Sequence, residues 1–388
     1  MNFELTEERQ MLQDTLRRYL SDRYTTAARN AIIDSESGMS DEIWTELAEL
    51  GVIGALFTED QGGFGGAGFD LTTVFEELGR AGVVEPFLDT AILGGGLIAA
   101  LGDDTQKQLL DEVIAGGAHL ALAHGEPTSR YDLSRVETTV VQNGTTGGGD
   151  DVQNGQIIVL NGRKAVVVNA EAAGHLIVSA RESGAADDPS GISLFLVPAG
   201  TPGLSMRGYP LFSGGRAAEV TLDNVTLPAR ARLGLANKGF EALSDVIARA
   251  NVALVAEVMG AMETATELTR DYLMTRKQFG RPIGTFQALA HRYSDLLIEL
   301  EQARSAVINA AGHLDKSSKN RDLQIASTRN LIGRVGRHVA EDTIQMHGGI
   351  AMTQEYELAH IAKRITLADH RFGDTDYHLE RFIDLSAA

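Results

Sequence analysis

Two short stretches near the C-terminus decide how this chain is interpreted: Arg276-Lys277-Gln278-Phe279-Gly280-Arg281-Pro282-Ile283-Gly284 and, about 70 residues later, Gln345-Met346-His347-Gly348-Gly349. A guanidinium gives a bidentate, always-charged contact to phosphate. A glycine pair after a helix lets backbone N–H groups approach a ligand closely. Either stretch alone is also typical of an ordinary helix end, where cations meet the helix dipole and glycine stops the helix.

The sequence around these stretches predicts long amphipathic helices from about residue 234 to 388. Apolar residues recur there every three or four positions, which is the spacing of a buried helix face and favours a helical bundle. They are Leu243, Ile247, Ala250, Leu254, Val258 and Met262, followed by Leu289, Leu296, Leu300, Ala303 and Val307.

The preceding part of the chain divides into two further regions. Residues 119–233 carry short β-branched runs such as Ile157–Leu160 and Ile192–Val197, which predict an antiparallel β domain, a barrel or sandwich. Residues 1–118 are predicted to be helical, beginning with a helix capped by Thr6. The expected class is therefore α+β with domains 1–118, 119–233 and 234–388, and the missing βαβ alternation argues against a Rossmann domain.

Composition excludes several classes of function. The net charge of −19 argues against binding nucleic acid, and the absence of cysteine removes disulfides and thiolate chemistry. No run of about 18 apolar residues is present, so we expect no membrane span. The acidic N-terminus lacks a signal pattern, so we expect a cytoplasmic protein, and no metal-ligand spacing is found.

The two stretches, in this order and with this helix–strand–helix arrangement, resemble acyl-CoA dehydrogenases over essentially the whole chain. Gly51–Ala55, Phe75–Arg80 and Glu126-Pro127 fit the same family, and the closest branch resembles the pimeloyl-CoA dehydrogenase small subunit. The resemblance implies an N-terminal helical domain, a central β-barrel or sandwich and a C-terminal four-helix bundle. It also implies FAD-dependent α,β-dehydrogenation of an acyl-CoA thioester.

The resemblance further implies which residues bind FAD. One set would reach the FAD of a neighbouring subunit, which implies an oligomer: Arg276, Gln278, Phe279, Gln287, Gln345, Gly348 and Gly349. A second set belongs to the β domain, where Val166 and Val168 replace a tryptophan and a threonine of the family: Leu122, His124, Gly125, Val166 and Val168.

Substrate contacts are expected from Arg130, Tyr131 and Arg249. Arg130 and Tyr131 occupy a segment that is usually Gly-x-Gly-Ser-Asp in the family. Arg130 either forms an ion pair or meets an acidic substrate tail, and the sequence leaves both open.

The catalytic base is the unsolved position. The chemistry needs a carboxylate within reach of the α carbon, yet counting from the glycine pair places Phe372 at the family's glutamate. Counting back along the helix before Arg276 places Ala250 at the alternative position, beside Arg249. Asp374 is the nearest candidate base and a further candidate cofactor contact, and Glu257 is a weaker one.

Three interpretations remain open. The first is a subunit of a hetero-oligomer in which a homologous acyl-CoA dehydrogenase subunit supplies the base. The second is a self-sufficient homo-oligomer that uses Asp374. The third is a flavin oxidase, a monooxygenase or a flavin-free scaffold on the same fold. The resemblance also implies an electron-transfer flavoprotein as acceptor and suggests a dicarboxylyl or bulky acyl group, steroid side chains included.

Overall fold

The N-terminal region is helical, and the computed structural model describes residues 5–143 and 157–387 of the chain. The first helix starts after Thr6, whose side chain accepts the Arg9 N–H, and it buries Leu16 and Leu20. The elements of this region are α1 (Glu7–Arg23), α2 (Thr26–Ile33), α3 (Asp41–Glu49), η1 (Gly54–Leu56), η2 (Glu59–Gln61), α4 (Gly68–Ala81), the π-helix η3 (Leu88–Gly95), α5 (Gly96–Leu101) and α6 (Asp104–Ile114).

The central region is one mixed sheet with the strand order β6-β7-β3-β2-β4-β5-β8, and β1 pairs with β4. Its elements are β1 (Leu120–Ala123), β2 (Thr139–Asn143), β3 (Ile157–Val168), β4 (His175–Arg181), β5 (Ile192–Pro198), β6 (Leu204–Pro210), β7 (Arg216–Pro228), η4 (Ala229–Ala231) and β8 (Arg232–Leu233).

The expectation of a purely antiparallel domain is wrong at two pairings. β1 runs parallel to β4 from Leu120 to Ala123, and β2 runs parallel to β4 at Thr139. Parallel neighbours need a long connection, and β2 and β3 supply it because they lie between β1 and β4 in the chain. The short apolar runs predict the strands themselves but not these pairings.

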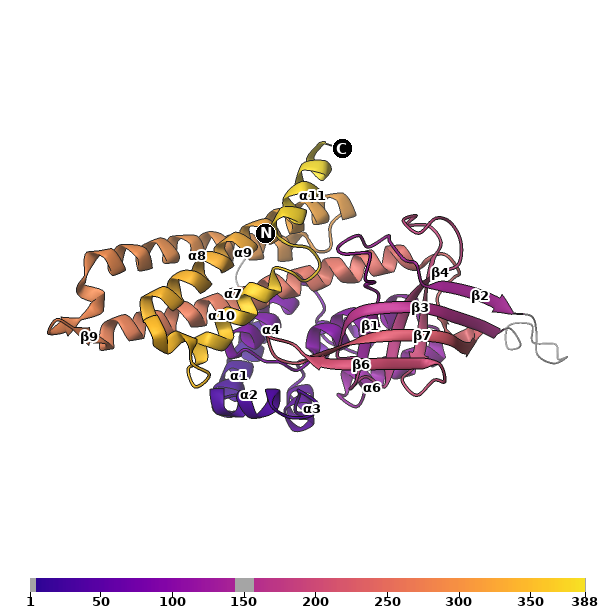
Figure 1. Cartoon of the computed structure of the whole chain (residues 1–388), viewed down its shortest axis with the longest axis horizontal. Coiled ribbons are helices and arrows are strands. Elements are labelled where there is room, and N and C mark those ends of the chain that lie inside the picture. The colour runs from indigo at the N-terminus through magenta and orange to yellow at the C-terminus, as the bar shows by residue number, and fades with distance from the viewer. Residues whose placement is uncertain (1–4, 144–156, 388) are drawn as a thin grey trace.

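The C-terminal region forms the predicted helical bundle, in which α7, α8, α9 and α10 pack against one another. Its elements are α7 (Gly239–Thr275), β9 (Lys277–Gln278), β10 (Arg281–Pro282), η5 (Ile283–Thr285), α8 (Gln287–His313), α9 (Ser318–His347), η6 (Gly348–Met352), α10 (Glu357–Ala368) and α11 (Thr375–Ala387). The β9 hairpin lies at one end of the long axis and β2 at the other (Figure 1). Within the described residues, no helix is both long and apolar enough to cross a membrane.

Two glycines bring the N-terminal helices against the bundle. A Cβ on Gly79 of α4 would lie 1.9 Å from the carbonyl oxygen of Glu257, and one on Gly260 of α7 would lie 1.9 Å from that of Glu76. Only glycine permits such close backbone contact. The crossing of α4 and α7 therefore sets the distance between the N-terminal helices and the bundle.

Candidate active site

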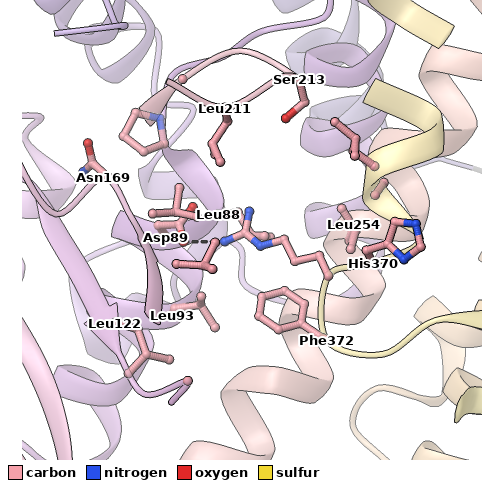
Figure 2. A pocket seen from close by; sticks show the side chains of 18 of the residues that line it. Leu88, Asp89, Leu93, Leu122, Asn169, Leu211, Ser213, Leu254, His370 and Phe372 are labelled. Carbon is pink, nitrogen blue, oxygen red and sulfur yellow. Dashed lines mark hydrogen bonds and ion pairs between the residues drawn. The ribbon is translucent and has the colours of Figure 1, made fainter. Parts of the chain in front are cut away.

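A cavity of about 990 Å³ lies where the three regions meet. The N-terminal helices contribute α4 and η3, and the sheet contributes β1, the end of β3 and the loop 211–215. The bundle contributes α7, α9, α10, residues 370–372 and α11. Figure 2 shows side chains from all three regions pointing toward this space. Such a cavity falls in the size range of ligand pockets, about 300–1,000 Å³.

The sheet side of the cavity is formed by the second set of predicted cofactor residues. Leu122, His124, Gly125, Val166 and Val168 all line the cavity. The register of β3 against β7 shifts between Lys164 and Val167, so the strand bulges there. The bulge puts Val166 at φ 52°, and its side chain is 58% exposed at the cavity. A β-branched residue in this backbone region is strained, and strain of this kind clusters at functional sites.

A buried polar network supports this wall from behind. The Lys164 ammonium is fully buried and donates to Glu126 Oε1 at 2.7 Å, to Ser179 Oγ at 3.1 Å and to the His124 carbonyl oxygen at 3.3 Å. His124 Nδ1 lies 2.9 Å from Ser179 Oγ. Burial, and secondarily Lys164, lowers the pKa of His124 to about 3, so this imidazole is neutral. The network fixes the backbone at 124–126.

Two ion pairs with buried carboxylates also line the cavity. Asp89, the second residue of η3, pairs with the Arg371 guanidinium, as Figure 2 shows. Glu257 of α7 pairs with Arg364 of α10 at 2.5 Å. Burial raises the pKa of the Asp89 carboxyl, and Arg371 opposes that shift.

The loop between α10 and α11 presents Arg371 and Phe372 to the cavity because Arg329 holds its backbone. Arg329 is 2% exposed, and its Nη2 donates to the carbonyl oxygens of Arg371 and Gly373, both at 2.7 Å. Phe372 adopts φ 60° and lines the cavity. The position predicted to face the substrate therefore does face the cavity, but with an apolar ring.

Asp374 has a different environment from the one expected of a base. It is not among the residues that line the cavity. Its Oδ1 accepts the Tyr377 N–H at 2.9 Å at the start of α11, and its Oδ2 lies 3.4 Å from Arg130. The Tyr377 N–H, with help from Arg130, lowers the pKa of Asp374. Arg130 and Tyr131 both line the cavity, and the Tyr131 ring packs 5.4 Å from that of Tyr377.

Arg249, predicted to contact substrate, and Ala250, at the family's alternative base position, lie outside the cavity lining. Arg249 donates to the carbonyl oxygen of Gly66 at 2.6 Å and does not line the cavity. Ala250 is fully buried in α7, also outside the lining. The next cavity-lining residue of α7 is Asn251, one helical step further. The helix face of Arg249 is turned toward the N-terminal region, so the structure does not bring it to the other predicted substrate residues.

The first set of predicted cofactor residues forms a surface that we name the outer edge: Arg276, Gln278, Phe279, Gln287, Gln345, Gly348 and Gly349. All seven are exposed, none lines the cavity, and Phe279 is 91% exposed. Tyr272 and His347 stack with ring centroids 4.4 Å apart and so join the two stretches. A Cβ on Gly348 or Gly349 would meet nothing within 4 Å, so backbone lies open there.

Sequence reasoning missed Asp89, Arg371 and Arg329. Asp89 had a signal, because it is a lone carboxylate within the apolar run Phe87–Leu93. A charged residue is almost never fully buried unless it is paired. A buried Asp89 in this run therefore predicts a cationic partner elsewhere in the chain. Nothing in the sequence names Arg371 as that partner, 282 residues away.

Comparisons with known proteins identify the family of this chain. The family descriptions acyl-CoA dehydrogenase N-terminal, middle and C-terminal domain match residues 6–117, 121–225 and 237–383. The probable acyl-CoA dehydrogenase YngJ of Bacillus subtilis (strain 168) is 27% identical, over 99% of this chain and 98% of that protein.

Two solved structures have the same fold. A structure described as a variant of the Tcur3481-Tcur3483 steroid ACAD is 31% identical with a TM-score of 0.84, covering 98% of both chains. The ChsE4-ChsE5 complex from Mycobacterium tuberculosis is 23% identical with a TM-score of 0.85, covering 100% of this chain and 99% of that one. The family prediction is confirmed, while the pimeloyl-CoA branch stays a prediction. The chain belongs to the acyl-CoA dehydrogenase family of FAD-dependent oxidoreductases.

Proposed function

We propose that this chain catalyses the α,β-dehydrogenation of an acyl-CoA thioester in the cavity between its three regions. The observation that carries the proposal is a cavity of about 990 Å³ whose lining combines strand residues with a charged pair. Leu122, His124 and Gly125 line it from the sheet, and Asp89 and Arg371 contribute the charged side chains. A flat cofactor and a thioester can lie together in such a cavity.

The residues present fit FAD. Leu122, His124 and Gly125 would hold the isoalloxazine ring with backbone groups, with Val166 and Val168 packing beside it. The Lys164 network keeps that backbone in place. When bound, FAD supplies the acceptor for the hydride that leaves the β carbon. This chain's own residues position the thioester, exclude water and take up the α proton.

The outer edge would complete a second subunit's FAD site. Its exposed Arg276 offers a guanidinium for phosphate, and Gly348-Gly349 offers open backbone. None of these groups lines the chain's own cavity, so one subunit would serve the cofactor of the next. The proposal therefore includes an oligomer.

The test is a visible absorption spectrum of the chain purified alone, followed by anaerobic titration with acyl-CoAs. The panel contains hexanoyl-CoA, pimeloyl-CoA and the CoA thioester of a steroid side-chain acid. We expect bound flavin that one of these thioesters bleaches. Bound flavin that produces peroxide with substrate in air would instead favour an oxidase.

A second candidate is a hetero-oligomer in which a homologous subunit supplies the base. It is favoured by Phe372 and Ala250, neither of which can accept a proton, and by the likeness to a structure whose description pairs two names, Tcur3481 and Tcur3483. Its test is co-expression with a homologous subunit. Turnover that appears only in the mixed complex, and is lost with the partner's glutamate, would establish this candidate.

The remaining assignments are proposals of the same kind. The 31% identity to a protein described as a steroid ACAD favours a bulky acyl group, which the panel covers. A relative of 26% identity is described as a subunit of a complex with Etf, so we propose an electron-transfer flavoprotein as the acceptor. The cytoplasmic location stays a prediction from the sequence.

A further inference from the structure

The carboxylates that line the cavity differ in how their oxygen atoms are used. Asp132 and Glu171 are exposed, and Asp322 is bound by Arg321 and Arg381. None of the three is therefore a buried carboxylate available to a substrate.

In two of the buried carboxylates, both oxygen atoms already accept hydrogen bonds from the protein. Glu126 accepts from Lys164 and Thr138 through Oε1 and from the Glu137 N–H through Oε2. Glu85 accepts from the Tyr24 hydroxyl through Oε2 and from the Ser40 N–H through Oε1. With each oxygen already hydrogen-bonded, neither is placed to take a proton from a ligand.

Asp89 and Glu257 remain, and the contacts of Asp89 single it out. Its ion pair with Arg371 uses Oδ1, and no other side chain of the described residues hydrogen-bonds its carboxylate. Arg371 directly precedes Phe372, and its guanidinium lies 4.9 Å from the centroid of the Phe372 ring. Glu257 is instead held by Arg364, from α10. Asp89 is thus the buried carboxylate tied to the loop from which a base is expected.

Asp89 lies close to the strand that is expected to hold the flavin. Its element η3 packs against β1, and Figure 2 shows Asp89 near Leu88, Leu93 and Leu122, with Phe372 across from them. Leu122 belongs to the strand whose backbone would carry the flavin ring. A thioester bound on that ring would therefore lie near Asp89.

We propose that Asp89 is the proton acceptor of this enzyme, supplied by η3 in place of the missing glutamate and oriented by Arg371. The inference rests on the proposed dehydrogenation. The α C–H bond of the thioester breaks, and its proton moves to the Asp89 carboxylate. The electron pair forms the α,β double bond as the β hydride leaves to the bound FAD. Arg371 is a positioning residue that keeps the carboxylate ionised.

Burial supports this role. Desolvation raises the pKa of Asp89, opposed mainly by Arg371, while Glu257 adds to the rise. A carboxylate with a raised pKa is a stronger base than an ordinary aspartate. Asp374 shows the opposite shift, since its pKa is lowered by the helix N–H that it accepts.

The experiment measures proton abstraction separately from oxidation. Wild-type protein and variants, with their flavin kept reduced by dithionite, are incubated in D₂O with each of the three thioesters of the panel. Mass spectrometry then follows deuterium incorporation at the α carbon. We expect Asp89→Asn to lower the exchange rate by about 100-fold or more, the usual contribution of a positioned base, with flavin still bound. Asp89→Glu should restore part of it.

Three variants control for the loss of an ion pair. Glu77→Gln breaks a comparably buried carboxylate–arginine pair, with Arg17, outside the cavity and should leave exchange unchanged. The double variant Asp89→Asn/Arg371→Gln removes the unpaired arginine, and exchange should stay low. Recovery of exchange in the double variant would overturn the proposal, because the single variant would then have failed through an uncompensated charge. Glu257→Gln tests the competing carboxylate, and a loss there with normal exchange in Asp89→Asn would also overturn it.

The outcomes separate this inference from the function on which it rests. In the first outcome, wild-type protein binds FAD and oxidises a thioester, and Asp89→Asn exchanges deuterium at the normal rate. The dehydrogenase function is then supported, and the role of Asp89 is wrong. Wild-type protein that holds flavin but exchanges none of the thioesters has no working acceptor, and the proposal fails. Protein without flavin overturns the proposed function and this inference together.

Discussion

The outer edge and the inner cavity wall use the same kinds of side chain in opposite ways. At the outer edge, Arg276 and Phe279 stand exposed, and Phe279 is 91% exposed. Around the cavity, Arg371 and the buried Arg329 behind it are bound by carboxylate and carbonyl oxygens of the same chain. Under the proposed function the outer edge would be covered by a second subunit and its cofactor, whereas the charges around the cavity are already paired within one chain.

The comparison teaches which substitutions should harm folding and which should harm only binding. Buried charges that lose a partner are left without water, so their loss destabilises the folded state. Substituting an exposed side chain should leave the free energy of unfolding of the isolated chain almost unchanged. Variants on the two sides should separate stability from cofactor affinity.

The largest effect is expected behind the sheet wall. Lys164→Met should lower the free energy of unfolding by about 3–5 kcal/mol, because it leaves the buried Glu126 carboxylate without its cation. Urea denaturation measures it. The double variant Lys164→Met/Glu126→Gln should recover part of the loss, and a single-variant loss below about 1 kcal/mol would contradict the account.

On the outer edge, Arg276→Ala should leave the free energy of unfolding of the isolated chain unchanged. It should weaken FAD binding by about 1.5–3 kcal/mol, roughly 10- to 150-fold, the usual value of a hydrogen bond to a charged group. Titration calorimetry gives the dissociation constant. Arg270→Ala is the matched control, since Arg270 is an exposed arginine of α7 that pairs with its neighbour Asp271. If both variants weaken FAD binding equally, the assignment of the outer edge to FAD binding is wrong.

Lowering the pH should destabilise the fold through two buried histidines that line the cavity. Burial lowers the pKa of His124 and of His378 to about 3, with Lys164 adding to the first shift and Arg329 to the second. The unfolded chain takes up these protons near pH 6.5, so stability is present above that pH and is lost as pH falls toward about 3. In that window each histidine lowers the free energy of unfolding by about 1.4 kcal/mol for every pH unit that the pH falls.

Denaturation midpoints between pH 7 and pH 4 test the acid prediction. His378→Asn should flatten the dependence by the share of one histidine, since asparagine keeps an acceptor for the Arg329 Nε–H that reaches His378 Nε2 at 3.3 Å. An equally steep dependence in that variant would show that His378 does not carry it.

Phe279→Ser is also expected to have little effect on folding. The ring is 91% exposed and meets the edge of Phe286 with centroids 6.1 Å apart, so the free energy of unfolding of the monomer should change by less than about 0.5 kcal/mol. The mass of the assembly, measured by analytical ultracentrifugation with FAD present, should fall. An unchanged assembly would remove Phe279 from the predicted subunit contact.

Local patterns predicted more of the fold than of the site. The apolar spacing from Leu243 to Met262 predicts α7, and the β-branched runs predict β3 and β5. The parallel pairing of β1 with β4 escaped prediction, because register between distant strands is set by the packed sheet. The direction of Arg249 escaped for a similar reason: one step along α7 separates it from the cavity-lining face of Ala248 and Asn251.

By itself the sequence determined the family, the helix–strand–helix order and the absence of a glutamate at Phe372 and Ala250, since each of these is a matter of residue type and spacing along the chain. Only the tertiary structure decided which charges meet. Asp89 and Arg371 are 282 positions apart, and their elements meet at the cavity because η3 and α10 both pack against α7. An ion pair between distant residues depends on distances that arise when helices pack, and no local pattern carries that information.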